Sequence, residues 1–104
     1  MQELKLRKEF FRKVLDGTKT STSRKGIRNV TCGILMLVMT EDESIKQPVF
    51  VNSIKITHLK DIDDEEAIKQ GYKTAEELVT VLSSIYPNIN NDEPITIIEF
   101  RVIQ

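Results

Sequence analysis

The sequence predicts a small α+β domain, built on a mostly antiparallel β-barrel or strongly curved sheet with flanking helices. Its 104 residues are enough for one hydrophobic core and too few for two, so we expect residues 1–104 to form a single domain. The local patterns run strand, helix, strand, two further strands, a helical insertion and a final strand. The longest apolar run, GILMLVM, has no alternation, which is typical of a strand covered on both sides.

The segment RKEFFRKVLDG predicts a short amphipathic helix. Phe10 and Val14 stand at i, i+4 spacing. Phe11 and Leu15 repeat this spacing, and basic residues occupy the opposite face. Gly17 follows where a left-handed C-cap is expected, so we expect the helix to end there.

The next segment, TKTSTSR, is expected to be extended, because serine and threonine compete with helical hydrogen bonding. In a regular strand Lys19 and Thr22 would face opposite ways, since they are three residues apart. A turn after Gly17, or a bulge, would bring them together. We expect Ser21 and Ser23 to be spacers.

Two strands and two helices complete the predicted fold. VFVNSIKITHL changes parity near Asn52 and Ser53, which indicates a β-bulge or bend. DIDDEEAIKQG predicts a short helix with Asp63 as N-cap and Glu66 at the capping-box position. A second helix is expected after Thr74, with its apolar stripe against the core. The closing segment, ITIIEFRVI, predicts a strand with one polar face. The stripe consists of Leu78, Val81, Leu82 and Ile85.

The composition, with 39% hydrophobic and 30% charged residues, indicates a soluble globular protein. No apolar run approaches the roughly 20 residues that span a bilayer, and charges interrupt the N-terminal segment, so we expect no membrane segment and no secretory signal. The predicted location is therefore the cytoplasm. The one cysteine, Cys32, excludes an internal disulfide, and its place beside Gly33 favours a packing role.

The charges are unevenly distributed along the chain. Residues 1–28 contain nine lysines and arginines against three acidic residues, whereas residues 61–77 contain seven acidic residues against two lysines. The basic segment suits a phosphate backbone or another anion. Each charge also has a plainer explanation as part of a solvated helix face.

The common cofactor and metal motifs are missing from the sequence. The one histidine, His58, is expected at a strand end as a packed or rim residue, and no other spacing suggests metal ligands. There is no P-loop, dinucleotide fingerprint or GxSxG motif. We therefore expect neither a metal nor a cofactor.

The candidate reactive residues lie in the hydroxyl-rich segment TKTSTSR. A threonine hydroxyl needs a base within hydrogen-bond reach to act as a nucleophile, and lysine can be that base when burial or a nearby cation lowers its pKa. Lys19 and Thr22 are the candidate pair, and Arg24 can bind a phosphate or carboxylate in two-pronged fashion. Lysine and threonine clusters also occur as solvated surface, so residue chemistry alone leaves both interpretations open.

The segment FFRKVLDGTKTSTSR resembles the signature of the ASCH domains, the small branch of the PUA-like superfamily. In that signature a first helix ends at a glycine and a Lys-Thr-x-Thr-x-Arg strand follows. The likeness is greatest to the YqfB type, the N4-acetylcytidine amidohydrolases. TCGILMLV, AIKQGYKTAEELVTVLSSIYP and ITIIEFRVI also resemble segments of that family, so the resemblance covers nearly the whole chain and implies a PUA-like β-barrel.

The resemblance implies a catalytic lysine and threonine at Lys19 and Thr22, with Thr22 attacking an acetyl carbonyl and Lys19 taking its proton. The family's third catalytic residue is a glutamate that helps to protonate the leaving amine. It falls on Gly71, or on Gln70 if one residue of length difference is allowed, and neither can exchange a proton at neutral pH. The glutamates nearby are interpreted as solvated or capping carboxylates: Glu65, Glu66, Glu76 and Glu77. A second departure is Ile34, where the family often has aspartate.

Two classes of function follow from this resemblance. One is an amidohydrolase acting on N4-acylated cytidine or a related acylated nucleoside. The other is a non-catalytic PUA-like module that binds RNA or a modified nucleoside, because loss of a general acid typically removes about 10²- to 10⁴-fold in rate. In either case we expect Arg24, Thr20 and Gln70 to contact the ligand. The expected partner is a nucleoside-like molecule or RNA and not a membrane, and the oligomeric state stays open.

Overall fold

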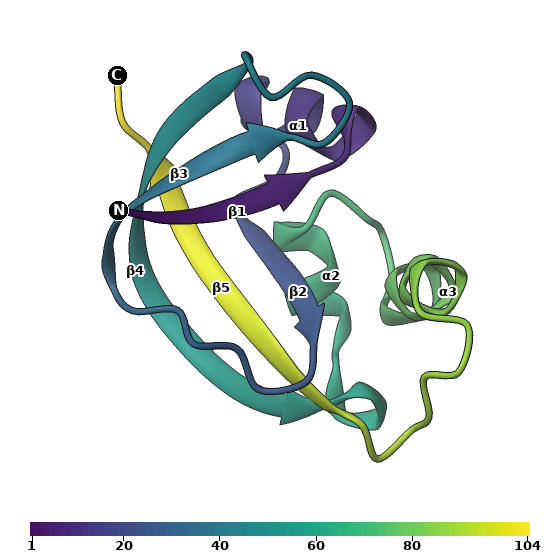
Figure 1. Ribbon diagram of the computed structural model, residues 1–104. Helices are drawn as coiled ribbons and strands as arrows, with labels where there is room; N and C mark the ends of the chain where they lie inside the picture. The colour runs from purple at the N-terminus through teal and green to yellow at the C-terminus, as the bar shows by residue number, and fades with distance from the viewer.

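A computed structural model describes residues 1–104, and its central feature is one five-stranded sheet that curls into a half-barrel (Figure 1). The strand order is β1-β3-β4-β5-β2, so β1 and β2 are the two edges and do not pair with each other. Only β1 and β3 are parallel, which confirms the predicted mostly antiparallel α+β class. The strands are β1 (Gln2–Leu6), β2 (Ser21–Lys25), β3 (Gly33–Met39), β4 (Lys46–His58) and β5 (Pro94–Val102).

Three helices and one short 3-10 turn connect the strands. Helix α1 closes one end of the curl, while α2 and α3 lie together beside the sheet on the side of β2 (Figure 1). None of the helices is long and apolar enough to span a membrane. The helices are α1 (Lys8–Leu15), α2 (Asp64–Lys69) and α3 (Ala75–Ile85), and the 3-10 turn is Leu59–Asp61.

Helix α1 ends as the sequence predicts, but it buries fewer apolar residues than expected. Gly17 adopts φ 87°, the left-handed conformation that favours glycine at a helix end. Phe11 and Val14 are buried, whereas Leu15 is 55% exposed. The expected place of Leu15 on the buried face with Phe11 is therefore wrong, because the helix buries Phe11 and Val14, which are spaced i, i+3.

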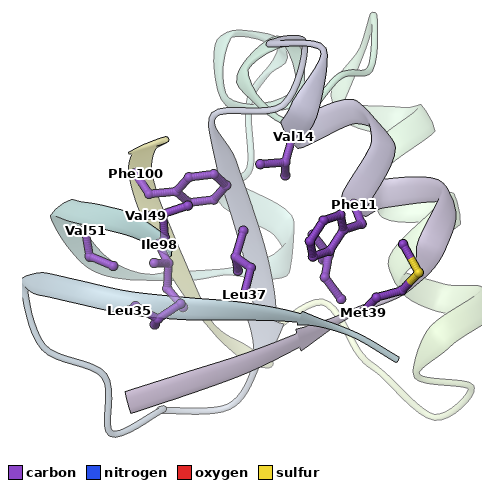
Figure 2. Close-up of a cluster of buried hydrophobic side chains, with 10 residues drawn as sticks. Phe11, Val14, Leu35, Leu37, Met39, Val49, Val51, Ile98 and Phe100 are labelled. Carbon is purple, nitrogen blue, oxygen red and sulfur yellow. The ribbon is translucent and has the colours of Figure 1, made fainter. Parts of the chain in front are cut away.

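The main hydrophobic core fills the inside of the curl. Figure 2 shows Phe11 of α1, Leu37 of β3 and Phe100 of β5 directed into this space. Burial of such side chains is the main stabilising contribution to a fold of this size. The full cluster is Leu6, Phe11, Val14, Leu35, Leu37, Met39, Val49, Val51, Ile98 and Phe100.

Strand β5 separates this core from a second one. Ile98 belongs to the inner core, whereas Ile95 and Ile97 belong to a cluster that α2 and α3 cover. The prediction of one polar face thus holds only toward the end of the strand, where Glu99 pairs with Lys69 of α2 at 3.1 Å and Arg101 is exposed. The second cluster is Leu59, Ile62, Ala67, Leu78, Leu82, Ile95 and Ile97.

Other local predictions had mixed outcomes. The register of β4 against β5 shifts between Val51 and Ser53, which confirms the predicted bulge. The Asp63 carboxylate accepts a hydrogen bond from the backbone N–H of Glu66, 2.8 Å away, which confirms the N-cap of α2. Thr74 caps α3 in the same way.

Cys32 is exposed, so its predicted packing role is wrong, because it precedes the strand and lies outside the sheet.

Candidate functional site

A cavity of about 170 Å³ lies where the two unpaired edges of the sheet face each other. Residues from the end of β1 and from β2 line it, and Phe10 of α1 contributes an aromatic ring. The apolar stripe of α3 forms another wall, so the residues that the sequence places in the core also border this space. That stripe is Leu78, Val81, Leu82 and Ile85.

The structure places Lys19 and Thr22 together in this cavity. Lys19 precedes β2, which begins at Ser21, so strand parity does not separate the two side chains. The turn at Gly17 is held by the backbone N–H of Lys19, which donates to the Lys13 carbonyl 3.0 Å away. Lys19 and Thr22 are each only 4% exposed, and both line the cavity.

The environment of Lys19 lowers its pKa from 10.5 to about 7. Burial is the largest cause, because it disfavours the charged form, and the positive charges of Arg24 and Lys13 act in the same direction. The carboxylate of Glu66 opposes them. The Nζ of Lys19 makes no ion pair, and it lies 5.8 Å from the centroid of the Phe10 ring. Near neutral pH, a large fraction of this amine is therefore uncharged.

Thr22 faces the inside of the curl. It stands opposite Ile98 of β5, and directly opposed residues of an antiparallel pair share a face of the sheet. Its hydroxyl forms no hydrogen bond within the protein, so it is available to a ligand in the cavity.

Arg24, two residues further along β2, bridges the open seam. Its Nη2 donates to the backbone carbonyl of Lys5 on β1, 2.6 Å away. Its Nε is buried without a partner. Burial lowers the pKa of Arg24, the Tyr86 hydroxyl opposes this shift, and the nearby charge of Arg28 adds to it. The guanidinium therefore has one group fixed by the fold and one buried donor that lacks an acceptor.

Polar residues on the opposite face of β2 form a closed network with α2. The Glu66 carboxylate accepts hydrogen bonds from the Ser21 hydroxyl, 2.8 Å away, and from the Gln70 amide, 2.9 Å away. The same Gln70 nitrogen donates to the Ser23 hydroxyl at 2.6 Å. Ser21 and Ser23 are thus not spacers. Glu66 is also not a solvated or capping carboxylate, because its side chain turns into the protein and is only 5% exposed.

Of the two positions where the resemblance places a glutamate, only one faces the cavity. Gln70 lines it, whereas Gly71 does not. Gly71 adopts φ 90°, and a Cβ there would lie 3.2 Å from the Lys13 side chain. An L side chain at Gly71 would therefore be strained, and Gln70 is the residue that occupies the site.

The remaining predicted residues lie elsewhere. Thr20 is exposed and outside the cavity lining, and its hydroxyl donates to the Lys69 carbonyl at 3.4 Å. Its role as a ligand contact stays a prediction. His58 is also exposed, 3.5 Å from Asp61. No group of three or more His, Cys, Asp or Glu side chains is arranged to hold a metal.

Four residues of this site have no predicted role there from the sequence: Ser23, Glu66, Tyr72 and Tyr86. Tyr72 and Tyr86, the only two tyrosines, both line the cavity. Glu66 supports it from behind. The available signal for Glu66 was its spacing of four from Gln70, which places both side chains on one face of α2.

The chain is a small α+β domain whose curled half-barrel has a cavity at its open seam, with a buried lysine and threonine in the lining. The family model for the ASCH domain matches residues 1–104, so the chain belongs to the ASCH domain family. No curated protein matches the sequence.

Solved structures support the same fold. An ASCH domain from Lactobacillus crispatus is similar, with a TM-score of 0.77 and 13% identity over 90% of this chain and 70% of that one. The hypothetical protein PH0355 has a TM-score of 0.74 and 21% identity, with 98% of each chain covered. A mutant ASCH protein from Zymomonas mobilis has a TM-score of 0.68 and 15% identity over 98% of this chain and 71% of that one. At these identities the likeness establishes the fold alone.

Proposed function

We propose that the protein is an amidohydrolase that removes the acyl group from N4-acylated cytidine or a related acylated nucleoside. The observation that carries this proposal is the buried Lys19 amine, whose pKa is lowered to about 7 and which shares the cavity with the unpartnered Thr22 hydroxyl. A lysine that is partly uncharged at neutral pH is a competent general base. A threonine with such a base within hydrogen-bond reach is an activated nucleophile. The two side chains form no hydrogen bond with each other without a ligand, so the proposal requires that they come within that reach when substrate is bound.

In the proposed reaction the uncharged Lys19 amine takes the proton of the Thr22 hydroxyl while the oxygen attacks the acyl carbonyl carbon. The resulting Lys19 ammonium gives the proton to the nitrogen of the substrate as the carbon–nitrogen bond breaks. The products of this half-reaction are the free nucleoside amine and an acyl ester on Thr22. Lys19 then takes a proton from water, the hydroxide cleaves the ester, and the carboxylic acid leaves as Thr22 regains its proton.

Gln70 limits the expected rate. A carboxylic acid at this place would share the proton transfer to the leaving nitrogen, and an amide cannot. Because one general acid contributes about 10²- to 10⁴-fold, we expect slower turnover than that of an enzyme with a carboxylic acid there. Lys19 is then the only residue that takes the proton from Thr22 and gives it to the leaving nitrogen.

The test is to incubate the purified protein with N4-acetylcytidine and to measure cytidine by chromatography. We expect cytidine release by the wild type and a fall to background in Thr22→Ala. Thr80→Ala is the matched control, because Thr80 is exposed on α3 and does not line the cavity. No release by the wild type, or a Thr22→Ala variant as active as the wild type, contradicts the proposal.

A specific observation favours a second candidate, a module that binds a modified nucleoside or RNA without catalysis. Gln70, which is not an acid, faces the cavity. The buried Arg24 Nε is a further donor without an acceptor. Electrostatic RNA binding would weaken steeply as salt rises, because each neutralised phosphate releases counterions. Undetectable RNA binding at low salt would remove the RNA form of this candidate.

A further inference from the structure

The side chain of Gln70 is held rigidly by the network behind the cavity. It is only 1% exposed. Its amide nitrogen donates to the Ser23 hydroxyl at 2.6 Å and to the Glu66 carboxylate at 2.9 Å, so both of its N–H groups are used. The Glu66 carboxylate is itself fixed by the Ser21 hydroxyl, 2.8 Å away.

This network determines which end of the amide faces the cavity. A carboxylate only accepts hydrogen bonds, so the amide nitrogen of Gln70 must point toward Glu66 and cannot exchange places with its carbonyl oxygen. The carbonyl Oε1 of Gln70 forms no hydrogen bond within the protein, and Gln70 lines the cavity. The cavity therefore contains a fixed acceptor whose direction is imposed from behind.

We propose that Gln70 is the residue that selects the base, by accepting a hydrogen bond from the N4 amino or amide N–H of a cytosine-type ring. This inference rests on the proposed nucleoside site and names the group that recognises the base. Cytosine presents a donor at N4, whereas uracil presents an acceptor at the same place. A uracil-type ring would set its oxygen against the Gln70 oxygen, and both would lose their hydrogen bonds to water.

Other lining residues suit the same ring. Beyond N4, the pairing edge of cytosine carries acceptors only, and Lys19 and Arg24 contribute donors to this cavity. Phe10, Tyr72 and Tyr86 supply aromatic surface, on which bases stack. The cavity, at about 170 Å³, is smaller than the roughly 300 to 1,000 Å³ of typical small-molecule sites, so it suits one base and not a long segment of polymer.

Glu66 is then a positioning residue, because it acts on the ligand only through Gln70. In Glu66→Gln the new amide can donate as well as accept, so the Gln70 amide is free to turn its nitrogen toward the cavity. The expected result is loss of base preference and not loss of the cavity, since the two side chains have nearly the same shape. A merely structural role for Glu66 would weaken binding of both bases together.

The experiment measures the dissociation constants of cytidine and uridine by NMR titration of the isotope-labelled full chain. We expect the wild type to prefer cytidine by about tenfold or more, the effect of one hydrogen bond to a buried group. In Glu66→Gln and in Gln70→Met the preference should fall to about twofold or less. Glu65→Gln is the matched control, because Glu65 is exposed on the same helix, and it should keep the wild-type preference.

The outcomes separate this inference from the proposed hydrolysis. Preference for cytidine without any release of cytidine from N4-acetylcytidine supports base selection and contradicts the catalytic proposal. If the protein hydrolyses N4-acetylcytidine but binds uridine as tightly as cytidine, the catalytic proposal is supported and base selection by Gln70 is contradicted. Base selection is also overturned if neither nucleoside binds at millimolar concentration, or if Glu66→Gln and Gln70→Met both keep the full preference.

Discussion

The two faces of strand β2 differ in how their polar side chains are hydrogen-bonded. On the face toward α2, the Ser21 and Ser23 hydroxyls form hydrogen bonds with Glu66 and Gln70. On the other face, the Nε of Arg24 is buried without a partner. The Lys19 amine and the Thr22 hydroxyl border the cavity and have no hydrogen-bond partner within the protein. One strand thus carries a hydrogen-bonded network on one face and groups without protein partners on the other, and Ser23 and Gln70 of that network also border the cavity.

This difference indicates where the fold is stabilised and where it is prepared for a ligand. A buried polar group with partners contributes modestly to stability, whereas one without partners lowers it by about 1 to 3 kcal/mol. Proteins tolerate such a loss mainly at functional sites, where the free groups act on a substrate. Substitutions on the two faces should therefore change stability in opposite directions.

The largest effect is expected at Lys19. Lys19→Met removes the proposed base, so hydrolysis of N4-acetylcytidine should fall by about 10²- to 10⁴-fold. The same change should raise the free energy of unfolding at pH 7 by about 2 to 4 kcal/mol, because a buried amine with a lowered pKa is replaced by an apolar chain. Denaturant unfolding at several pH values measures the second effect.

The free energy of unfolding of the wild type should depend on pH through Lys19. Between pH 7 and 10.5 the unfolded chain binds a proton at Lys19 that the folded chain has lost, so wild-type stability should rise with pH across this window. Lys19→Met should lack this rise. Lys73→Met is the control, because Lys73 is exposed, and it should change stability by less than about 0.5 kcal/mol. A Lys19→Met variant less stable than the wild type at pH 7 would contradict the account.

A change in the apolar core should have the opposite effect on stability. Leu37 is fully buried in the inner core, and Leu37→Ala should lower the free energy of unfolding by about 2 to 5 kcal/mol through lost burial and a new void. Denaturant unfolding measures this directly. If Lys19→Met and Leu37→Ala destabilised the protein alike, the lining of the cavity would be ordinary core.

A smaller pair of changes compares the two faces of β2 directly. Ser21→Ala removes a donor to the buried Glu66 carboxylate and should destabilise the protein by about 1 to 3 kcal/mol. Thr22→Val removes a hydroxyl without partners at the same size, so it should leave stability nearly unchanged or raise it. Thermal unfolding measures the stability of both variants. Equal destabilisation by the two changes would contradict the proposed difference between the two faces of β2.

The smallest effects concern the charges around Lys19. Arg24→Gln removes a charge that lowers the pKa of Lys19, so this pKa should rise and the acid limb of the pH–rate profile should move to higher pH. Glu66→Gln removes a charge that raises the same pKa, so its limb should move to lower pH. The dependence of kcat/KM on pH measures both shifts. Movement of the two limbs in the same direction would show that these residues act on Lys19 by some route other than their charge.

The sequence predicts the individual strands, helices and turns of this fold better than the way in which the strands pair. The bulge between Val51 and Ser53, the N-cap at Asp63 and the turn at Gly17 all have local signals, and the structure confirms them. The parallel pairing of β1 with β3 and the open seam between β1 and β2 depend on contacts far apart in the chain. Local patterns carry no information on such contacts.

The site shows the same division. The glycine before Lys19 and Thr22 predicts a turn, and the structure confirms this turn and places both residues in the lining of one cavity. Their catalytic roles stay a prediction. The place of Glu66 three residues after Asp63 predicts a capping box, whereas in the fold its carboxylate turns toward the Ser21 hydroxyl. The pKa of Lys19 likewise depends on burial, which the sequence of a polar, hydroxyl-rich segment does not indicate.

Titration of the Lys19 amine shows directly whether the cavity holds an uncharged base. Side-chain NMR of the full chain, with the Lys19 signal assigned by comparison with Lys19→Met, follows the amine from acid to alkaline pH. The expected midpoint is about 7. A midpoint near 10.5, the ordinary value for lysine, would mean that the cavity does not hold an uncharged base at neutral pH, and it would contradict the central claim.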